Sequence, residues 1–285
     1  PPVEGYDLMG DVHGRAITSE RLLQKLGYRK LQGVYQHPKR RIIFLGDIVD
    51  RGPHIREAVL LVHSMVQKGS AHMVLGNHEH NALTYCTQFK NLQTNSFEYL
   101  RPHTTANSLL IAETLEQFAR YPDDWKEMLR WFRTLPLFME FGSAKNGNAF
   151  RVVHACWDHA VIAQHKEVFG DGHFDEDFLH QSAHIHTKAA DTIQLLTRGV
   201  VFPLPEGSKV VTQEGHVRST FRTKFWAQHA QTYGDLLFQP DPIPAEIASL
   251  PISHEHRAQM VRYGLDQPPL FVGHYWLKGH PQPIT

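Results

Sequence analysis

The chain has few cysteines, no excess of charge of either sign and no long apolar run. Cys86 and Cys156 are the two cysteines among 285 residues, too few for a disulfide framework, so a reducing cytoplasm is the expected location. The formal net charge is +0 and no basic stripe is present, which argues against nucleic acid and an anionic membrane as partners. No run of about 18 apolar residues occurs, so no transmembrane helix is predicted.

What remains is the composition of an ordinary globular protein with many histidines. Hydrophobic residues make up 41% and charged residues 20% of the chain, and its length fits one large domain or two small ones. Because no internal repeat and no clear linker occur, a single catalytic domain over residues 1–285 is predicted. The chain starts at Pro1 without a methionine or an evident signal peptide, so the completeness of its ends is left open, as is its oligomeric state.

The first part of the chain alternates short apolar runs with helical patterns. Strands are predicted at residues 6–9, 41–45 and 71–75. A helix with Thr18 or Ser19 as its cap follows the first strand, and a helix over residues 55–66 follows the second. This β-α-β-α-β order predicts a mostly parallel sheet covered by helices.

The rest of the chain is less regular. Residues 105–133 have a helical pattern that Pro122 is expected to break. Residues 137–141 and 149–153 flank a turn at residues 145–148 and predict a hairpin. A further helix over 185–196 and a last strand over 270–272 are predicted, and residues 202–270 otherwise carry no assignable pattern.

Five of the predicted strands end on residues that can bind metal ions. The segments are GDVHG at 10–14, GDIVDRG at 46–52, GNHE at 76–79, VHA at 153–155 and GH at 273–274. The carboxyl ends of strands in open α/β sheets form a common ligand-binding edge, so these side chains are expected to lie together. The six candidate ligands are Asp11, His13, Asp47, Asn77, His154 and His274.

Carboxylates combined with imidazoles suit a divalent transition metal such as manganese, iron or zinc. Six ligands are too many for one ion with open positions. Two ions about 3.5–4 Å apart that share a carboxylate fit better, and such a pair lowers the pKa of a bound water and clamps a phosphoryl group. Beside these ligands, Arg51 offers a bidentate fork to phosphate oxygens, and His78 can protonate a leaving group with Asp50 as its orienting partner.

The three segments GDVHG, GDIVDRGP and GNHE, followed by distant histidines, resemble the calcineurin-like metallophosphoesterases, and more narrowly the bacterial relatives of the phosphoprotein phosphatases. The resemblance implies an αββα sandwich in which two facing mixed β-sheets are flanked by helices. It also implies ligand roles: Asp11 and His13 bind the first metal, Asp47 bridges, and Asn77, His154 and His274 bind the second. His78 corresponds to the general acid, Asp50 to its partner and Arg51 to a phosphate clamp. The stretch TRGV at 197–200 is similar to one in which relatives carry a second phosphate-binding arginine, which makes Arg198 a candidate.

The function that the resemblance implies is hydrolysis of phosphomonoesters by direct attack of a metal-bound hydroxide. Two divalent cations are the expected cofactors, with manganese as the first candidate and iron or zinc as alternatives. A phosphoprotein, a nucleotide or a small phosphoester is the expected substrate class. Hydrolysis of dinucleoside tetraphosphates is an alternative, although that branch more often has an aspartate where Glu79 stands here. A catalytically silent metal-binding scaffold is a third reading, and the intact His78, Asp50 and Arg51 argue against it.

Some positions have simpler explanations. His154 is followed by Ala155 where relatives usually continue into glycine, and His254, His256 and His280 compete with His274 for its assignment. His80, just outside its motif, is expected to be solvated. Cys156, close to His154, is expected to be a buried apolar residue and not a nucleophile.

Overall fold

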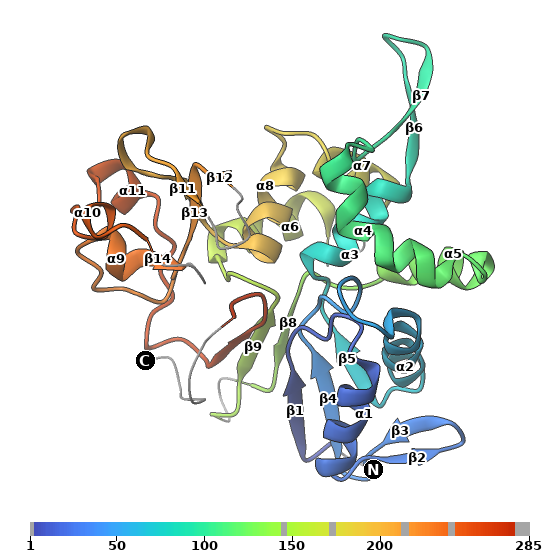
Figure 1. The fold of residues 1–285 in the computed structure, drawn as a ribbon. Coiled ribbons are helices and arrows are strands. Elements are labelled where there is room, and N and C mark those ends of the chain that lie inside the picture. The colour runs from blue at the N-terminus through green and yellow to red at the C-terminus, as the bar shows by residue number, and fades with distance from the viewer. Residues whose placement is uncertain (1–2, 144–146, 171–174, 212–216, 239–242, 277–285) are drawn as a thin grey trace.

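The computed structural model describes residues 3–143, 147–170, 175–211, 217–238 and 243–276 (Figure 1). Its first sheet has the order β1-β4-β5, and all strand pairs in it are parallel. These strands are β1 (Gly5–Met9), β4 (Arg40–Phe44) and β5 (Ala71–Met73). The parallel sheet predicted from the sequence is therefore confirmed, and its carboxyl edge is where the segments GDVHG, GDIVDRG and GNHE begin.

Two helices cover the outer face of this sheet, α1 (Ala16–Lys25) and α2 (Ile55–Gln67) (Figure 1). Helix α2 buries Ala58, Val59 and Val62 against the core that also holds residues of β4. The predicted cap of α1 at Thr18 or Ser19 is wrong, because the helix begins earlier, directly after Arg15. The backbone of Arg15 pairs with that of His54 in an isolated parallel β-bridge, which fixes the chain before α1 starts.

The second sheet joins segments that are far apart in the sequence. It consists of β8 (Phe138–Phe141), β9 (Phe150–Val153) and β15 (Leu270–Val272), in the order β15-β9-β8. Strands β8 and β9 are antiparallel, which confirms the predicted hairpin strands, while residues 144–146 of its turn lie outside the described residues. Strand β15 pairs in parallel with β9, and Val272 lies opposite Val153. This register brings the residues after both strands to one edge.

The two sheets face each other across an apolar layer. Ile43 of β4 and Val152 of β9 belong to one fully buried cluster. The ring of Tyr6 on β1 lies 4.8 Å from Phe141 and 5.5 Å from Phe150 on the second sheet. The two-sheet sandwich with flanking helices is thus present, with a parallel first sheet and a mixed second one.

Further helices and two hairpins surround the sandwich. The helices are α3 (Asn77–Cys86), α4 (Thr105–Phe118), α5 (Pro122–Phe132), α6 (His159–Phe169), α7 (Glu176–Ser182) and α8 (Lys188–Arg198). Pro122 does divide the helical stretch, and it does so as the first residue of α5, where its missing N–H costs nothing. The hairpins, which the sequence did not indicate, are β2 (Arg29–Leu31) with β3 (Val34–Gln36), and β6 (Gln88–Asn91) with β7 (Ser96–Tyr99). Figure 1 shows the β6–β7 hairpin projecting away from the body of the protein.

Residues 200–211, 217–238 and 243–260 form a separate lobe on the far side of the second sheet from α1 and α2 (Figure 1). Its elements are β10 (Val201–Pro203), a 3-10 helix (Pro205–Gly207), β11 (Val210–Val211), β12 (Val217–Arg218), β13 (Thr220–Thr223), α9 (Tyr233–Leu236), β14 (Leu237–Phe238), α10 (Ala245–Ala248) and α11 (His254–Ala258). A third cluster that contains Cys156, Phe238 and Tyr275 joins this lobe to the sandwich.

The single domain over residues 1–285 stays a prediction. No helix among the described residues is long and apolar enough to cross a membrane.

Candidate metal centre

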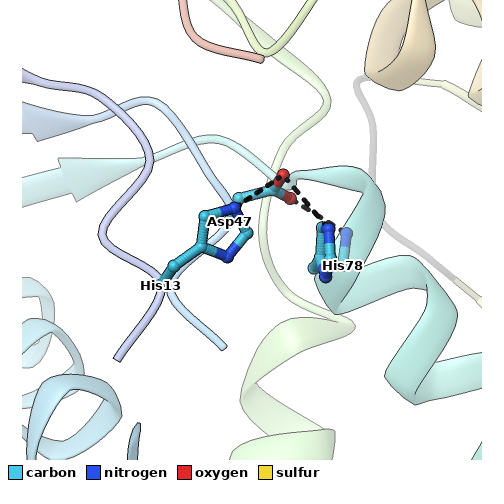
Figure 2. Close-up of side chains that lie close together, drawn as sticks. All are labelled: His13, Asp47 and His78. Atoms are coloured by element: carbon cyan, nitrogen blue, oxygen red, sulfur yellow. Dashed lines mark hydrogen bonds and ion pairs between the residues drawn. The ribbon is translucent and has the colours of Figure 1, made fainter. Parts of the chain in front are cut away.

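The loops that follow the strands of both sheets bring the six candidate ligands into one cluster. Asp47, at its centre, is 2% exposed, and its Oδ2 lies 3.2 Å from His154 Nε2 and 3.9 Å from His13 Nε2. Figure 2 shows Asp47 between His13 and His78. Two groups of possible ligands share Asp47: one with His13 and His78, the other with His154 and His274, and the ligand atoms of each group lie within 4.8 Å of one another.

Asp11 and Asn77 complete the cluster. The Oδ2 of Asp11 lies 3.9 Å from His13 Nε2, and its Oδ1 accepts a hydrogen bond of 2.9 Å from the backbone N–H of His274. The Oδ1 of Asn77 lies 3.2 Å from His154 Nε2. All six side chains therefore converge, and their individual roles as ligands stay predictions.

The donor atoms suit divalent cations. The Nε2 atoms of His13 and His274 are buried and have no hydrogen-bond partner among the residues that the structure describes. The Nδ1 of His13 donates to Val49 O at 2.8 Å, a hydrogen bond that leaves the Nε2 lone pair free for a metal. Burial lowers the pKa of His13, and burial together with the neighbouring His154 lowers the pKa of His274 to about 2. Both imidazoles are thus neutral, the form that binds metals.

Opposite charges dominate the centre of the cluster. Burial alone would raise the pKa of Asp47, but the adjacent His154 and His78 hold it below its usual range. Burial alone would lower the pKa of His154, but the charge of Asp47 and its hydrogen bond raise it to about 9. Asp47 is therefore a carboxylate at neutral pH, available to two cations at once.

A second group of residues, His78, Asp50 and Arg51, lies beside the ligand cluster. His78 Nδ1 donates to Asp50 Oδ2 at 2.5 Å, and Asp50 in turn accepts a hydrogen bond from the hydroxyl of Thr114. Arg51 Nη2 lies 3.3 Å from His78 Nε2. Burial would lower the pKa of His78, but the charges of Asp47 and Asp50 raise it above the ordinary value.

His78 also belongs to the first ligand group, so it could bind a metal or act as an acid. The hydrogen bond of Nδ1 to Asp50 leaves Nε2 free for either role, and the assignment of His78 as the acid stays a prediction. The guanidinium of Arg51 is 5.0 Å from the ring of Trp276, which belongs to the segment after β15.

Backbone strain is concentrated at this cluster. Five of the eight non-glycine residues with positive φ among those described belong to it: His13, Asp47, Asp50, Arg51 and His274. Each such conformation costs of order 1–3 kcal/mol and persists only where the surrounding contacts enforce it. No pattern in the sequence indicates this strain.

Glu79 is the residue that sequence reasoning missed. Its buried carboxylate accepts backbone N–H groups from Asp47 and Ile48, both at 2.8 Å, and from Gly76 at 3.0 Å. It thereby ties the loop after β4 to the start of α3. Its position three residues after Gly76, as in a capping box, was the available signal.

The remaining candidates differ in their surroundings. The expectation that His80 is solvated is wrong: the side chain is 5% exposed, and its Nε2 lies 2.9 Å from Ser182 Oγ. Cys156 is buried, as predicted, and burial raises the pKa of its thiol. His254 is the first residue of α11 in the other lobe, and His256 lies within the same helix. His280 lies outside the described residues.

Arg198, at the end of α8, faces the same space as the cluster. It lines a cavity of about 720 Å³ together with Arg51, Asn77 and His78. Its Nη2 donates to Asn81 Oδ1 at 2.6 Å, and burial lowers its pKa to about 10, so it remains a cation at neutral pH. Whether it contacts a phosphate stays a prediction.

Parts of this chain are similar in sequence or structure to known proteins. A sequence profile described as calcineurin-like phosphoesterase matches residues 7–221. The asymmetrical bis(5'-nucleosyl)-tetraphosphatase PrpE of Halalkalibacterium halodurans is 47% identical over 74 residues, 26% of this chain and 30% of that protein. PrpE of Oceanobacillus iheyensis is 47% identical over 73 residues, 25% and 29% of the two chains. The match thus spans less than a third of these relatives. A solved cold-active protein-tyrosine phosphatase of a psychrophilic Shewanella has a TM-score of 0.40 at 16% identity, with 63% of this chain and 54% of that chain covered.

Proposed function

Because this chain belongs to the calcineurin-like phosphoesterase family, we propose that it hydrolyses phosphomonoesters with two divalent cations at the cluster around Asp47. The observation that carries the proposal is the sharing of Asp47 by two ligand groups, directly beside the hydrogen-bonded His78 and Asp50. The substrate is a phosphoprotein, a nucleotide or a small phosphoester.

The side chains divide into two sets around the shared carboxylate. Asp11 and His13 would hold one cation and Asn77, His154 and His274 the other, with Asp47 common to both. When bound, such cations supply Lewis acidity, which lowers the pKa of a water molecule and offsets charge on the phosphoryl oxygens. Manganese is the first candidate, and iron and zinc are alternatives because the same ligand types accept them.

The phosphoryl group is bound and oriented by arginine. The guanidinium of Arg51 offers parallel N–H groups to two phosphate oxygens. Its proximity to His78 Nε2 places the bound phosphoryl group next to the proton donor. Arg198, which lines the same cavity, supplies a second fork.

His78 transfers a proton to the departing oxygen. Its Nδ1–H is fixed by Asp50, which is held in turn by Thr114, so that Nε2 faces the reacting group. The raised pKa of His78 keeps a proton available near neutrality, where a general acid is most effective. Water attacks phosphorus on the side opposite to this oxygen, and no phosphoenzyme forms.

The test uses purified protein with added Mn²⁺ and p-nitrophenyl phosphate. We expect hydrolysis by the wild type and loss of about a thousandfold or more in kcat/KM for Asp47→Asn, because the shared ligand of both cations is weakened. Asp123→Asn, at an exposed position on α5, is the matched control and should remain active. Full activity of Asp47→Asn would refute the bridging role. Elemental analysis of the same samples identifies the metal, and bound metal without turnover on any phosphoester would favour a silent scaffold.

Hydrolysis of dinucleoside tetraphosphates is a second candidate. It is favoured by the names of the two curated relatives and by a cavity much larger than one phosphoryl group needs. A competition assay with p-nitrophenyl phosphate and diadenosine tetraphosphate decides between them. A higher kcat/KM for the dinucleotide would make phosphomonoester hydrolysis the side reaction.

A further inference from the structure

The cavity beside the metal centre extends well beyond the residues assigned to the reaction. Its volume of about 720 Å³ is within the range of pockets that hold whole ligands, roughly 300–1,000 Å³. Arg51, Asn77 and His78 line it. Arg101, two residues after β7, and Arg198 of α8 also line it.

Arg101 and Arg198 are neighbouring cations. Burial is the main cause that lowers the pKa of Arg198, and the charge of Arg101 adds to it; burial and the charges of both arginines lower the pKa of His80, which lines the same cavity. Like charges that are partly buried together repel each other and are desolvated, so the arrangement is unfavourable unless an anion compensates it.

No carboxylate of the described chain compensates Arg101. The pKa of Arg101 is lowered by burial without an opposing interaction, and its guanidinium forms neither a hydrogen bond nor an ion pair with any described residue. Arg198 is hydrogen-bonded to the neutral side chains of Asn81 and Thr197. Asp191 is the carboxylate that lines the cavity, and it forms no ion pair within 4.0 Å with either arginine in the described structure.

An arginine fork matches the oxygens of phosphate and carboxylate groups. The part of the cavity lined by Arg101 and Arg198 can therefore bind an anion other than the one at the metal centre. We propose that Arg101 is a specificity-determining residue that binds a second anionic group of the substrate, so that molecules with two linked phosphoryl groups are preferred over simple monoesters. The proposal rests on the proposed function for the position of the first phosphoryl group. Arg101 itself takes no part in bond breaking.

The test measures binding to the metal-loaded protein, so that it does not depend on turnover. Calorimetry compares methylphosphonate with α,ω-alkylenediphosphonates that have one to four methylene groups between the two phosphonates. At one or more lengths, we expect the wild type to bind the diphosphonate about tenfold or more tightly than the monophosphonate, the gain typical of a charge-assisted contact. Arg101→Gln should lose this gain and keep its affinity for methylphosphonate.

Two further variants separate a specific contact from a general loss of charge or fold. Arg120→Gln, at an exposed arginine outside the cavity, should behave like the wild type, and Arg101→Lys should recover part of the gain. Equal melting temperatures exclude misfolding. Absence of the gain in the wild type at every length, or its persistence in Arg101→Gln, overturns the proposal. If Arg101-dependent binding is found but no phosphoester is hydrolysed, the subsite stands and the proposed function fails.

Discussion

The two halves of the molecule contribute to the metal centre in different ways. Residues 5–86 supply four of its candidate ligands from loops that follow the strands of one parallel sheet. Residues 150–276 supply two imidazoles, His154 and His274, from the segments after β9 and β15. These strands pair in parallel although more than a hundred residues separate them. The first half is therefore organised by local motifs, and the second by one long-range strand pairing.

The halves also differ in what holds their ligands in place. In the first half, Glu79 ties loops together through several backbone N–H groups, and most of the strained residues lie there. In the second half, the backbone N–H of Gly273 donates to His154 O, and that of His274 donates to Asp11 Oδ1, both at 2.9 Å. The second half therefore depends on the register of its strands, and the first half depends on a buried network of side-chain contacts.

Removing one imidazole from each half should have the largest effect. For His274→Ala we expect the metal content to fall from two ions to about one, and kcat/KM for p-nitrophenyl phosphate to fall about a thousandfold, because one cation of the pair is lost. His13→Ala should have the same effect from the other half. Elemental analysis and steady-state kinetics provide the two measurements.

The matched control for this pair is His254→Ala, at an exposed histidine of the other lobe, which should retain both ions and full activity. If His274→Ala still bound two metal ions, the role of His274 as a ligand would be disproved, and His154 would be the one candidate ligand left from the second half.

Packing around Asp47 should come next in magnitude. A Cβ on Gly76 would lie 2.2 Å from Asp47 Oδ1, so Gly76→Ala must displace the shared carboxylate. We expect activity to fall about a hundredfold and the free energy of unfolding to fall by about 1–3 kcal/mol, the usual cost of overpacking. Gly10→Ala is the control, because Gly10 also precedes a candidate ligand but a Cβ there would meet nothing within 4 Å. Similar losses in both variants would show that the glycines act through backbone freedom and not through space.

The sequence predicted the parts of this site that depend on local order. The strands before Asp11 and Asp47 and the pairing of polar residues with strand ends follow from apolar runs and glycines, which are visible without a structure. The start of α3 at Asn77 and the role of Glu79 were not predicted, because they depend on hydrogen bonds to a loop about thirty residues earlier. The presence of Arg101 and Arg198 in one cavity was not predictable either, since residues of α3, α7 and α8 line that cavity together.

Glu79 allows a test of the network in the first half. A glutamine has one acceptor oxygen and would turn N–H groups toward the backbone donors of Asp47 and Gly76, which leaves buried groups unsatisfied. We expect Glu79→Gln to lower the free energy of unfolding by about 2 kcal/mol, measured by urea denaturation. Glu116→Gln, at an exposed position of α4, should change it by less than about 0.5 kcal/mol. Equal stability of the two variants would mean that the loops are held by other contacts.

The smallest expected effect concerns an aromatic contact between Trp276 of the second half and Arg51 of the first. Trp276 lies 5.0 Å from the guanidinium of Arg51 and is 58% exposed. An exposed cation–π contact contributes about 0.5–1 kcal/mol, so Trp276→Leu should raise KM for p-nitrophenyl phosphate about two- to fivefold with little change in kcat. Trp276→Phe keeps a ring face and should recover most of this loss. A Leu variant with unchanged KM would show that Arg51 is oriented by its own half alone, through His78 and the strained backbone of its loop.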